Sequence, residues 1–149
     1  MRIHLGTDHA GYDFKEVLSE HLRTAGHEVI DHGAVDFDPQ DDYPAYCIAC
    51  AEAVAAEPDS LGVVIGGSGN GEQMAANLVA GVRAALCWNL ETAQLARQHN
   101  DARVISIGAR MHPEAEALAI VDAFLAEPFS GDDRHIRRIN QLTEYADRH

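Results

Sequence analysis

The fold is decided by residues 61–72, which read Leu-Gly-Val-Val-Ile-Gly-Gly-Ser-Gly-Asn-Gly-Glu. The first five residues are a continuous apolar run, which is typical of a strand buried on both faces of a parallel sheet. The glycine-rich turn that follows predicts a tight connection into a helix. A buried strand, a glycine turn and a helix in this order indicate an α/β protein with a parallel sheet.

Short apolar runs and amphipathic segments alternate along the rest of the chain as well. Strands are predicted over residues 2–6, 27–33, 61–65, 82–87 and 103–107. Helices are predicted over residues 11–25, 45–56, 72–79, 91–98, 112–126 and 132–147. Five strands that alternate with helices specify a three-layer α/β/α sandwich with a five-stranded parallel sheet. Because no linker or repeat interrupts the pattern, residues 1–149 are expected to form a single domain.

The composition is that of an ordinary globular protein and restricts the possible partners. The 149 residues are 46% hydrophobic, and 11 Lys and Arg against 24 Asp and Glu give a formal net charge of −13. A negative field disfavours DNA, RNA and anionic membranes, because each of them requires a cationic surface. No segment has the apolar length of a membrane span or the core of a signal peptide, so a cytoplasmic protein is expected.

Cys47 and Cys50 form a C-x-x-C pattern, which can indicate zinc binding or redox chemistry. Here the pattern lies in an alanine-rich helical run and has no second ligand pair nearby. The context favours small buried helix residues over a metal or redox site.

Ligands of open α/β sheets bind outside the carboxyl ends of the strands, at a point where the strand order reverses. This rule selects the loops that begin at Gly6, Gly33, Gly66 and Gly108, together with the loop after the fourth strand. The polar candidates that it yields are Asp8, His9, Ser68, Asn70, Glu72, His99, Asn100 and Arg110.

The glycine loop is the strongest of these signals. Glycines let a backbone approach a ligand closely, and a helix N-terminus directs free N–H groups at negative charge. The dinucleotide pattern G-x-G-x-x-G fails because its last position falls on Glu72, and the phosphate loop fails because it lacks a lysine. Backbone donors beside a carboxylate suit a reaction in which a carbon loses a proton and an oxyanion develops. The alternative is a tight turn in which Glu72 only complements the helix dipole.

Two other strand-end pairs have both a structural and a chemical interpretation. Asp8 either caps the following helix or takes part in chemistry, and His9 is a candidate phosphate ligand or proton shuttle. His99 and Asn100 either end a helix or form an acid/base pair over the pocket.

Arg134 and Arg138 share one face of the last helix, at a spacing of four residues. Two guanidinium groups on one face suit a phosphate or a carboxylate. The alternative is a solvated basic face.

Several motifs, taken in chain order, resemble the type B ribose-5-phosphate isomerases, a family that also contains galactose-6-phosphate and allose-6-phosphate isomerases. The motifs are Thr7-Asp8-His9-Ala10-Gly11, Asp42-Tyr43-Pro44, residues 67–72, His99-Asn100 and Arg134-His135-x-x-Arg138. The resemblance covers nearly the whole chain. It implies a Rossmann-like fold, no cofactor or metal, and a homodimer in which the helix over about residues 132–147 reaches the active site of the partner subunit.

The implied reaction interconverts ribose 5-phosphate and ribulose 5-phosphate through an enediolate, in the non-oxidative pentose phosphate pathway. By resemblance, Glu72 would move a proton between C1 and C2, and Ser68 would stabilise the oxyanion together with backbone N–H groups. His99 would help to open the furanose ring, and Asp8 would relay the hydroxyl proton. The expected substrate-binding residues are His9, Tyr43, Gly67, Gly69, Asn70, Gly71, Asn100 and Arg110. The phosphate contacts expected from the partner chain are Arg134, His135 and Arg138.

One departure from the family pattern concerns the base. Many members carry a catalytic cysteine directly before the glycine loop, where this chain has Gly66. A subgroup known from actinobacteria has a glutamate at the position of Glu72 instead, and this sequence is similar to that subgroup. The cysteines of this chain belong to other elements, so a thiolate base is not expected.

Several points stay open at the level of sequence. The helix dipole lowers the pKa of Glu72 and desolvation raises it, and the sequence does not decide between them. Preference for a pentose or a hexose phosphate depends on pocket depth near Tyr43 and Tyr46. The sequence does not distinguish a dimer from a tetramer. A non-catalytic sugar-phosphate or nucleotide sensor on the same fold is an alternative, whereas the failed fingerprint disfavours a dinucleotide-dependent dehydrogenase.

Overall fold

A computed structural model describes all residues 1–149 and contains one five-stranded, all-parallel sheet with the strand order β2-β1-β3-β5-β4. The strands are β1 (Arg2–Thr7), β2 (Glu28–Asp31), β3 (Leu61–Gly66), β4 (Ala84–Leu86) and β5 (Val104–Gly108). The helices are η1 (His9–Gly11), α1 (Tyr12–Thr24), α2 (Pro44–Ala56), α3 (Asn70–Asn77), α4 (Leu90–Asn100), α5 (Glu114–Ala126) and α6 (Asp133–Arg148). The predicted α/β class and the five-stranded parallel sheet are confirmed.

The boundaries differ from the prediction by a few residues, for local reasons. The helix expected from residue 112 begins at Glu114, because Pro113 is an extended N-cap residue with φ −59° and ψ 150°. The strand expected over 82–87 is limited to β4, an edge strand that pairs only with β5. These shifts leave every element in its predicted place along the chain.

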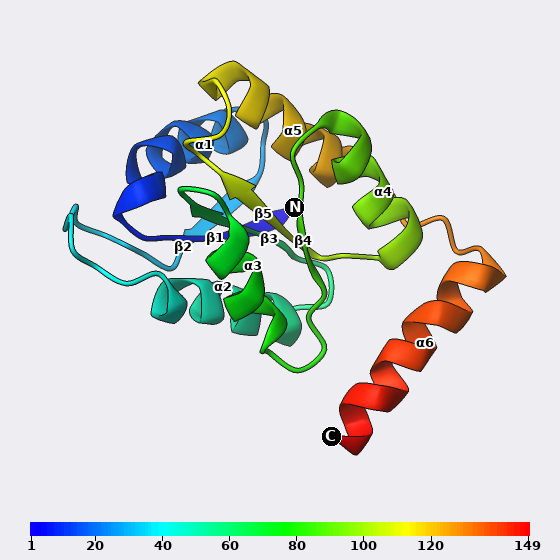
Figure 1. Cartoon of the computed structure of the whole chain (residues 1–149). Coiled ribbons are helices and arrows are strands. Elements are labelled where there is room, and N and C mark those ends of the chain that lie inside the picture. The colour runs from blue at the N-terminus through cyan, green and yellow to red at the C-terminus, as the bar shows by residue number, and fades with distance from the viewer.

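Helices cover both faces of the sheet and make three layers (Figure 1). On one face, the larger apolar core joins residues of β1, β3 and β5 to α1, α4 and α5, with Leu18, Ile65 and Phe124 among its members. On the other face, a smaller core joins Val64 and Val104 to α2 and α3. Alternate residues of the central strand β3 therefore enter different cores, as the continuous apolar run predicted.

The strand order places the ligand edge at the junction of β1 and β3. From β1 the chain moves outward to β2, and from β3 it moves the other way, toward β5 and β4. The two strands are adjacent, with Thr7 paired to Ile65, so Asp8 follows one strand beside the glycine loop that follows the other. The reversal of strand order thus brings two of the predicted motifs to one point.

The last helix, α6, projects away from the body of the molecule (Figure 1). Only His135 of its 16 residues is buried, whereas the apolar side chains of Ile136, Leu142 and Tyr145 are 41%, 58% and 61% exposed. None of the helices has both the length and the apolar character needed to cross a bilayer. The helix α6 therefore presents apolar surface that this chain does not cover.

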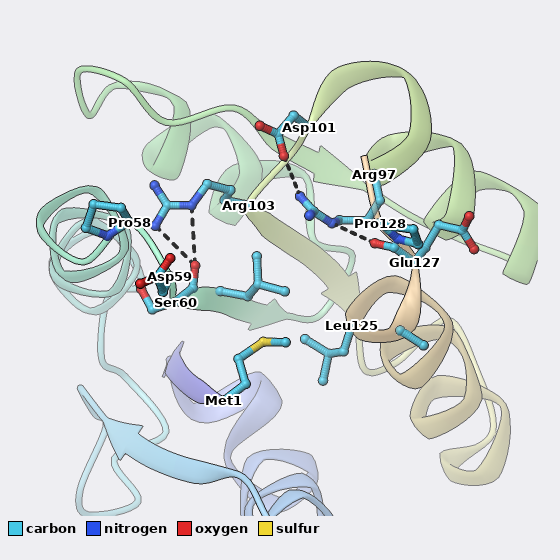
Figure 2. A pocket seen from close by; sticks show the side chains of 12 residues that line it. Met1, Pro58, Asp59, Ser60, Arg97, Asp101, Arg103, Leu125, Glu127 and Pro128 are labelled. Carbon is cyan, nitrogen blue, oxygen red and sulfur yellow. Dashed lines mark hydrogen bonds and ion pairs between the residues drawn. The ribbon is translucent and has the colours of Figure 1, made fainter. Parts of the chain in front are cut away.

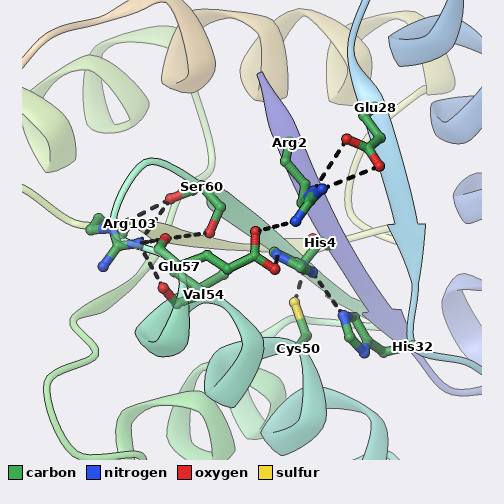
Figure 3. A network of polar contacts seen from close by, with 9 residues as sticks. All are labelled: Arg2, His4, Glu28, His32, Cys50, Val54, Glu57, Ser60 and Arg103. Carbon is green, nitrogen blue, oxygen red and sulfur yellow. Dashed lines mark hydrogen bonds and ion pairs between the residues drawn. The ribbon is translucent and has the colours of Figure 1, made fainter.

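A polar network ties β1 to β2 and to the end of α2 (Figure 3). Arg2 binds Glu28 and Glu57, and Nδ1 of the buried His4 lies 2.8 Å from Nε2 of His32. Nε2 of His4 is 3.4 Å from Glu57 Oε1, but not in hydrogen-bonding geometry. Burial and the mutual proximity of the rings lower the pKa of His4, and burial lowers that of His32. Both imidazoles are consequently neutral in the folded chain at neutral pH.

Candidate active site

The carboxylate of Glu72 lies where β3 gives way to α3. Gly69, with φ 89°, turns the chain into α3, and Glu72 belongs to the first turn of that helix. The residue is 5% exposed, and its carboxylate occupies the place where a Cβ atom at Gly66 would stand. Its Oε2 atom is buried without a hydrogen-bond partner. A buried acceptor that no protein group satisfies is energetically costly and typical of a reactive position.

Burial raises the pKa of Glu72 above its ordinary value, and the negative charge of Asp8 raises it further. The backbone N–H at the start of α3 acts in the opposite direction, as the helix dipole predicts, but its effect is smaller than that of burial. Desolvation therefore decides the question that the sequence left open. A carboxylate with a raised pKa is a stronger base than an exposed one.

Other side chains pack closely against the backbone of the glycine loop. The phenol of Tyr43 lies against Gly71, where any Cβ atom would overlap with it. Nη1 of Arg110 lies 3.2 Å from the position of a Cβ atom at Gly67. Ser68 is exposed and its Oγ accepts a hydrogen bond from the N–H of Asn70 at 3.2 Å. A phenol, a guanidinium and a hydroxyl thus lie along the glycine loop that leads from β3 to Glu72.

Beyond β1, Asp8 and His9 are held by different contacts. Asp8 Oδ1 caps η1 by accepting a hydrogen bond from the N–H of Ala10 at 2.9 Å. Nδ1 of His9 lies 2.8 Å from Oδ1 of Asp41 and 3.9 Å from Oδ2 of Asp8. Asp8, His9 and Asp41 thus form one cluster, in which an atom of each side chain lies within 4.8 Å of the other two. The structural role predicted for Asp8 is present, and its second oxygen remains close to His9.

Asp41 was not among the site residues predicted from the sequence. It lies between β2 and α2, in a polar stretch that contains Pro39. No periodicity or spacing links a loop residue to a histidine 32 positions away, so the contact depends on the tertiary fold. The position of the loop beside the ligand edge was the only available signal.

The structure does not bring His99 and Asn100 to the Glu72 edge of this chain. Both end α4, the helix that leads from β4 into β5, so they lie at the amino-terminal edge of the parallel sheet. Arg83, just before β4, donates a 2.8 Å hydrogen bond to the Asn100 carbonyl. Asp101, rather than Asn100, takes the left-handed C-cap conformation, with φ 44°. The chain assembles Asp8, His9, Tyr43, Ser68, Glu72 and Arg110 by itself, but not this pair.

His99 is instead part of a cluster with the start of α6. The rings of His99 and His135 are 4.2 Å apart between centroids, and His135 is hydrogen-bonded to Ser130 at 2.9 Å. His135 is 3% exposed, and burial together with the nearby His99 and Arg134 lowers its pKa. A buried, neutral His135 supports the His99 ring, while Arg134 and Arg138 beside it are exposed.

Cys47 and Cys50 have the structural role that the sequence favoured, and Cys87 is buried as well. Cys47, Cys50 and Cys87 are free and buried. Burial raises the pKa of each thiol, that of Cys50 and of Cys87 to about 12, and the negative charge of Glu72 raises that of Cys47 further. Although the Cys47 thiol lies within the electrostatic reach of Glu72, it stays protonated and is unsuited to act as a thiolate base.

A different pocket, of about 400 Å³, lies at the amino-terminal edge of the sheet (Figure 2). Its two arginines hold the fold together: Arg103 donates to the carbonyls of Val54 and Ser60, and Arg97 donates to those of Ala102 and Glu127. The guanidinium groups are thus engaged with the backbone. This pocket lies away from Glu72 and contributes nothing to its site.

Together, the fold and the loop geometry define an α/β protein whose ligand edge carries a buried basic carboxylate, backbone donors and cationic side chains. A family model described as ribose/galactose isomerase matches residues 3–142. The ribose-5-phosphate isomerase B of Mycobacterium tuberculosis H37Rv is 59% identical over 149 residues, which are 100% of this chain and 92% of the relative. The chain belongs to the ribose/galactose isomerase family.

Solved structures agree with this assignment. Ribose-5-phosphate isomerase B from Mycoplasma genitalium, determined with bound ribulose-5-phosphate, superposes with a TM-score of 0.94 at 42% identity, covering 98% of this chain and 96% of that one. The Clostridium thermocellum ribose-5-phosphate isomerase B also has a TM-score of 0.94, at 40% identity and 99% coverage of both chains.

Proposed function

We propose that the protein interconverts ribose 5-phosphate and ribulose 5-phosphate by moving a proton between C1 and C2. The observation that carries the proposal is the buried Glu72 carboxylate, with its raised pKa and its unpartnered Oε2, at the start of a helix. The substrate is supported by relatives at 59% identity that are named ribose-5-phosphate isomerase B and by the ligand named for the Mycoplasma genitalium structure.

In the aldose-to-ketose direction, Glu72 takes the proton from C2 of the open-chain sugar. The electron pair of that C–H bond forms the C1–C2 double bond, and the C1 carbonyl oxygen becomes an oxyanion. Ser68 and the N–H groups of residues 69–71 stabilise that oxyanion. Asp8 relays the proton of the C2 hydroxyl to the C1 oxyanion. As the C2 carbonyl forms, the electron pair of the C1–C2 double bond takes back the proton of Glu72 at C1, which leaves the ketose.

The phosphate needs more positive charge than this chain places at the site. His9 and Arg110 are its cations, but Asp8, Asp41 and Glu72 lie among them. Arg134 and Arg138 are exposed on a helix that leaves the body of the molecule. We place them on the phosphate bound in the partner subunit of a homodimer, where two guanidinium groups offset the local negative charge.

The position of His99 supports the same arrangement. A residue at the amino-terminal edge of the sheet cannot serve Glu72 of its own chain, which is at the carboxyl edge. Because His99 is packed against His135 at the base of α6, it would accompany the two arginines into the partner's site. There it would open the furanose ring, with Asn100 binding substrate hydroxyls. His135 would position the His99 ring, since its own ring is buried and neutral.

The substrate is tested by measuring kcat/KM for ribose 5-phosphate, allose 6-phosphate and galactose 6-phosphate with the same enzyme preparation. The proposal requires ribose 5-phosphate to be the best of the three. A higher kcat/KM for a hexose phosphate would support the proposed isomerisation but contradict ribose 5-phosphate as the substrate. Binding of ribose 5-phosphate without exchange of its C2 proton into D₂O would identify a sensor instead.

A further inference from the structure

One carboxylate oxygen of Asp41 is hydrogen-bonded only to His9. Its Oδ1 accepts hydrogen bonds from the backbone N–H and from the ring Nδ1 of His9, both at 2.8 Å. The side chain of Asp41 is 8% exposed, and its Oδ2 is buried without a partner. A desolvated carboxylate with this geometry holds one ring in one orientation.

The contact with Nδ1 decides where the ring carries its protons. A neutral imidazole has a single N–H, and a carboxylate only accepts hydrogen bonds, so the proton of the neutral ring is on Nδ1. Nε2 then has a lone pair and would repel a phosphate oxygen. Only the doubly protonated ring can donate to Asp41 and to a phosphate at the same time.

The charged groups around the ring favour that cation. The hydrogen bond that His9 donates to Asp41 raises the pKa of His9, and the charge of Asp8 also raises it, whereas burial and the charge of Arg110 lower it. The net direction is upward. The imidazolium is thus maintained to higher pH than in an isolated histidine.

We propose that Asp41 is a positioning residue, which fixes the neutral-ring proton of His9 on Nδ1 and thereby allows His9 to bind the substrate phosphate only as a cation. This inference rests on the proposed function, in which His9 is a phosphate ligand. Asp41 itself touches His9 and acts through it.

The test compares Asp41→Asn with the wild-type protein, because asparagine keeps the shape and an acceptor oxygen but removes the charge. The probe is sulfate, a dianion whose charge is constant over this pH range, and its dissociation constant is measured from about pH 5.5 to 8.5. The sulfate affinity of the wild-type protein should stay constant to a higher pH than that of Asp41→Asn. Above the lowered midpoint of the variant, its sulfate affinity should fall by up to about tenfold per pH unit, and its KM should rise with little change in kcat.

Asp42→Asn is the matched control, since Asp42 is the neighbouring residue, is exposed, and is not among the hydrogen-bond and ion-pair partners of His9. Its pH profile should follow the wild type. If the Asp41→Asn profile also follows the wild type, Asp41 does not control the charge of His9 and the proposal fails.

A measurement on the wild-type protein alone remains decisive if Asp41→Asn does not fold. Nitrogen-15 chemical shifts of the His9 ring, assigned with His9→Gln, should show the neutral ring protonated on Nδ1. A neutral ring protonated on Nε2 would overturn the inference. Neither readout requires turnover, so a protein with the expected sulfate and ring behaviour but no isomerisation would refute the proposed function and leave the role of Asp41 intact.

Discussion

The Glu72 carboxylate fills the volume that a side chain at residue 66 would occupy, because a Cβ atom built on Gly66 would overlap with it. A base delivered from residue 72 and a side chain at residue 66 therefore exclude each other in this fold. The relationship gives a physical reason for the departure at residue 66, where family members with a catalytic cysteine carry a side chain. Gly66 thus contributes to the site because it has no side chain, which leaves room for the Glu72 carboxylate.

Gly66→Ala should displace the Glu72 carboxylate and lower kcat by about 10²-fold or more, the usual effect of losing a positioned base. Its backbone conformation is not restricted to glycine, so the fold should persist. Steady-state kinetics and thermal unfolding test this. In a Glu72→Gln background the same substitution should cost little further activity, and full additivity of the two losses would contradict the steric argument.

Glu72→Gln should lower kcat by about 10²–10⁴-fold through loss of the base. It should also stabilise the fold at pH 7. The folded-state pKa of Glu72 is raised above its unfolded value of 4.5. Between these two pKa values the folded protein binds more protons than the unfolded chain, so the free energy of unfolding falls as pH rises through that range. Glutamine cannot ionise, so the variant does not lose this stability as pH rises.

The kcat/KM of the wild-type enzyme should fall as pH drops through the raised pKa of Glu72. A profile that stays level at acidic pH would exclude Glu72 as the base.

The His4–His32 pair predicts acid sensitivity. Both folded-state pKa values are lowered from 6.5, so the unfolded chain binds more protons below about that pH, and stability declines as pH falls. Urea unfolding between about pH 5 and pH 7 should therefore show a shallower pH slope in His4→Gln than in the wild type. An unchanged slope in His4→Gln would contradict this account of the network.

Replacing Cys47, Cys50 and Cys87 together with alanine should preserve catalysis within a few fold while lowering the free energy of unfolding by about 2–4 kcal/mol through lost packing. Activity is measured at a temperature well below the melting point of the variant. A folded but inactive protein would show that a thiol takes part in the chemistry.

The fold was largely predictable because its local signals agree with one another. The apolar run over residues 61–65 indicated a doubly buried strand, and the glycine turn placed Glu72 at its end. The pKa direction of Glu72 was not predictable, since it depends on how deeply the tertiary fold buries the carboxylate. Asp41 was missed because a loop residue carries no periodic signal.

The predicted topology already implied the location of His99, at the end of a helix that precedes a strand. The sequence argument nevertheless grouped His99 with the residues of the ligand loops. A helix that precedes a parallel strand ends at the opposite edge of the sheet from the ligand loops. That rule separates His99 from Glu72 within one chain, so the two residues can share a site only if a second chain supplies one of them.

The most direct test of the account is whether two inactive chains restore a shared site. Glu72→Gln and Arg134→Ala chains, each inactive alone, are mixed in equal amounts, unfolded and refolded together. In a mixed dimer, one site inherits both substitutions and the other receives neither, so random pairing should restore about a quarter of the sites. A Glu72→Gln and His99→Asn mixture should behave in the same way. A refolded mixture that is demonstrably heterodimeric but inactive would contradict a site built from two subunits.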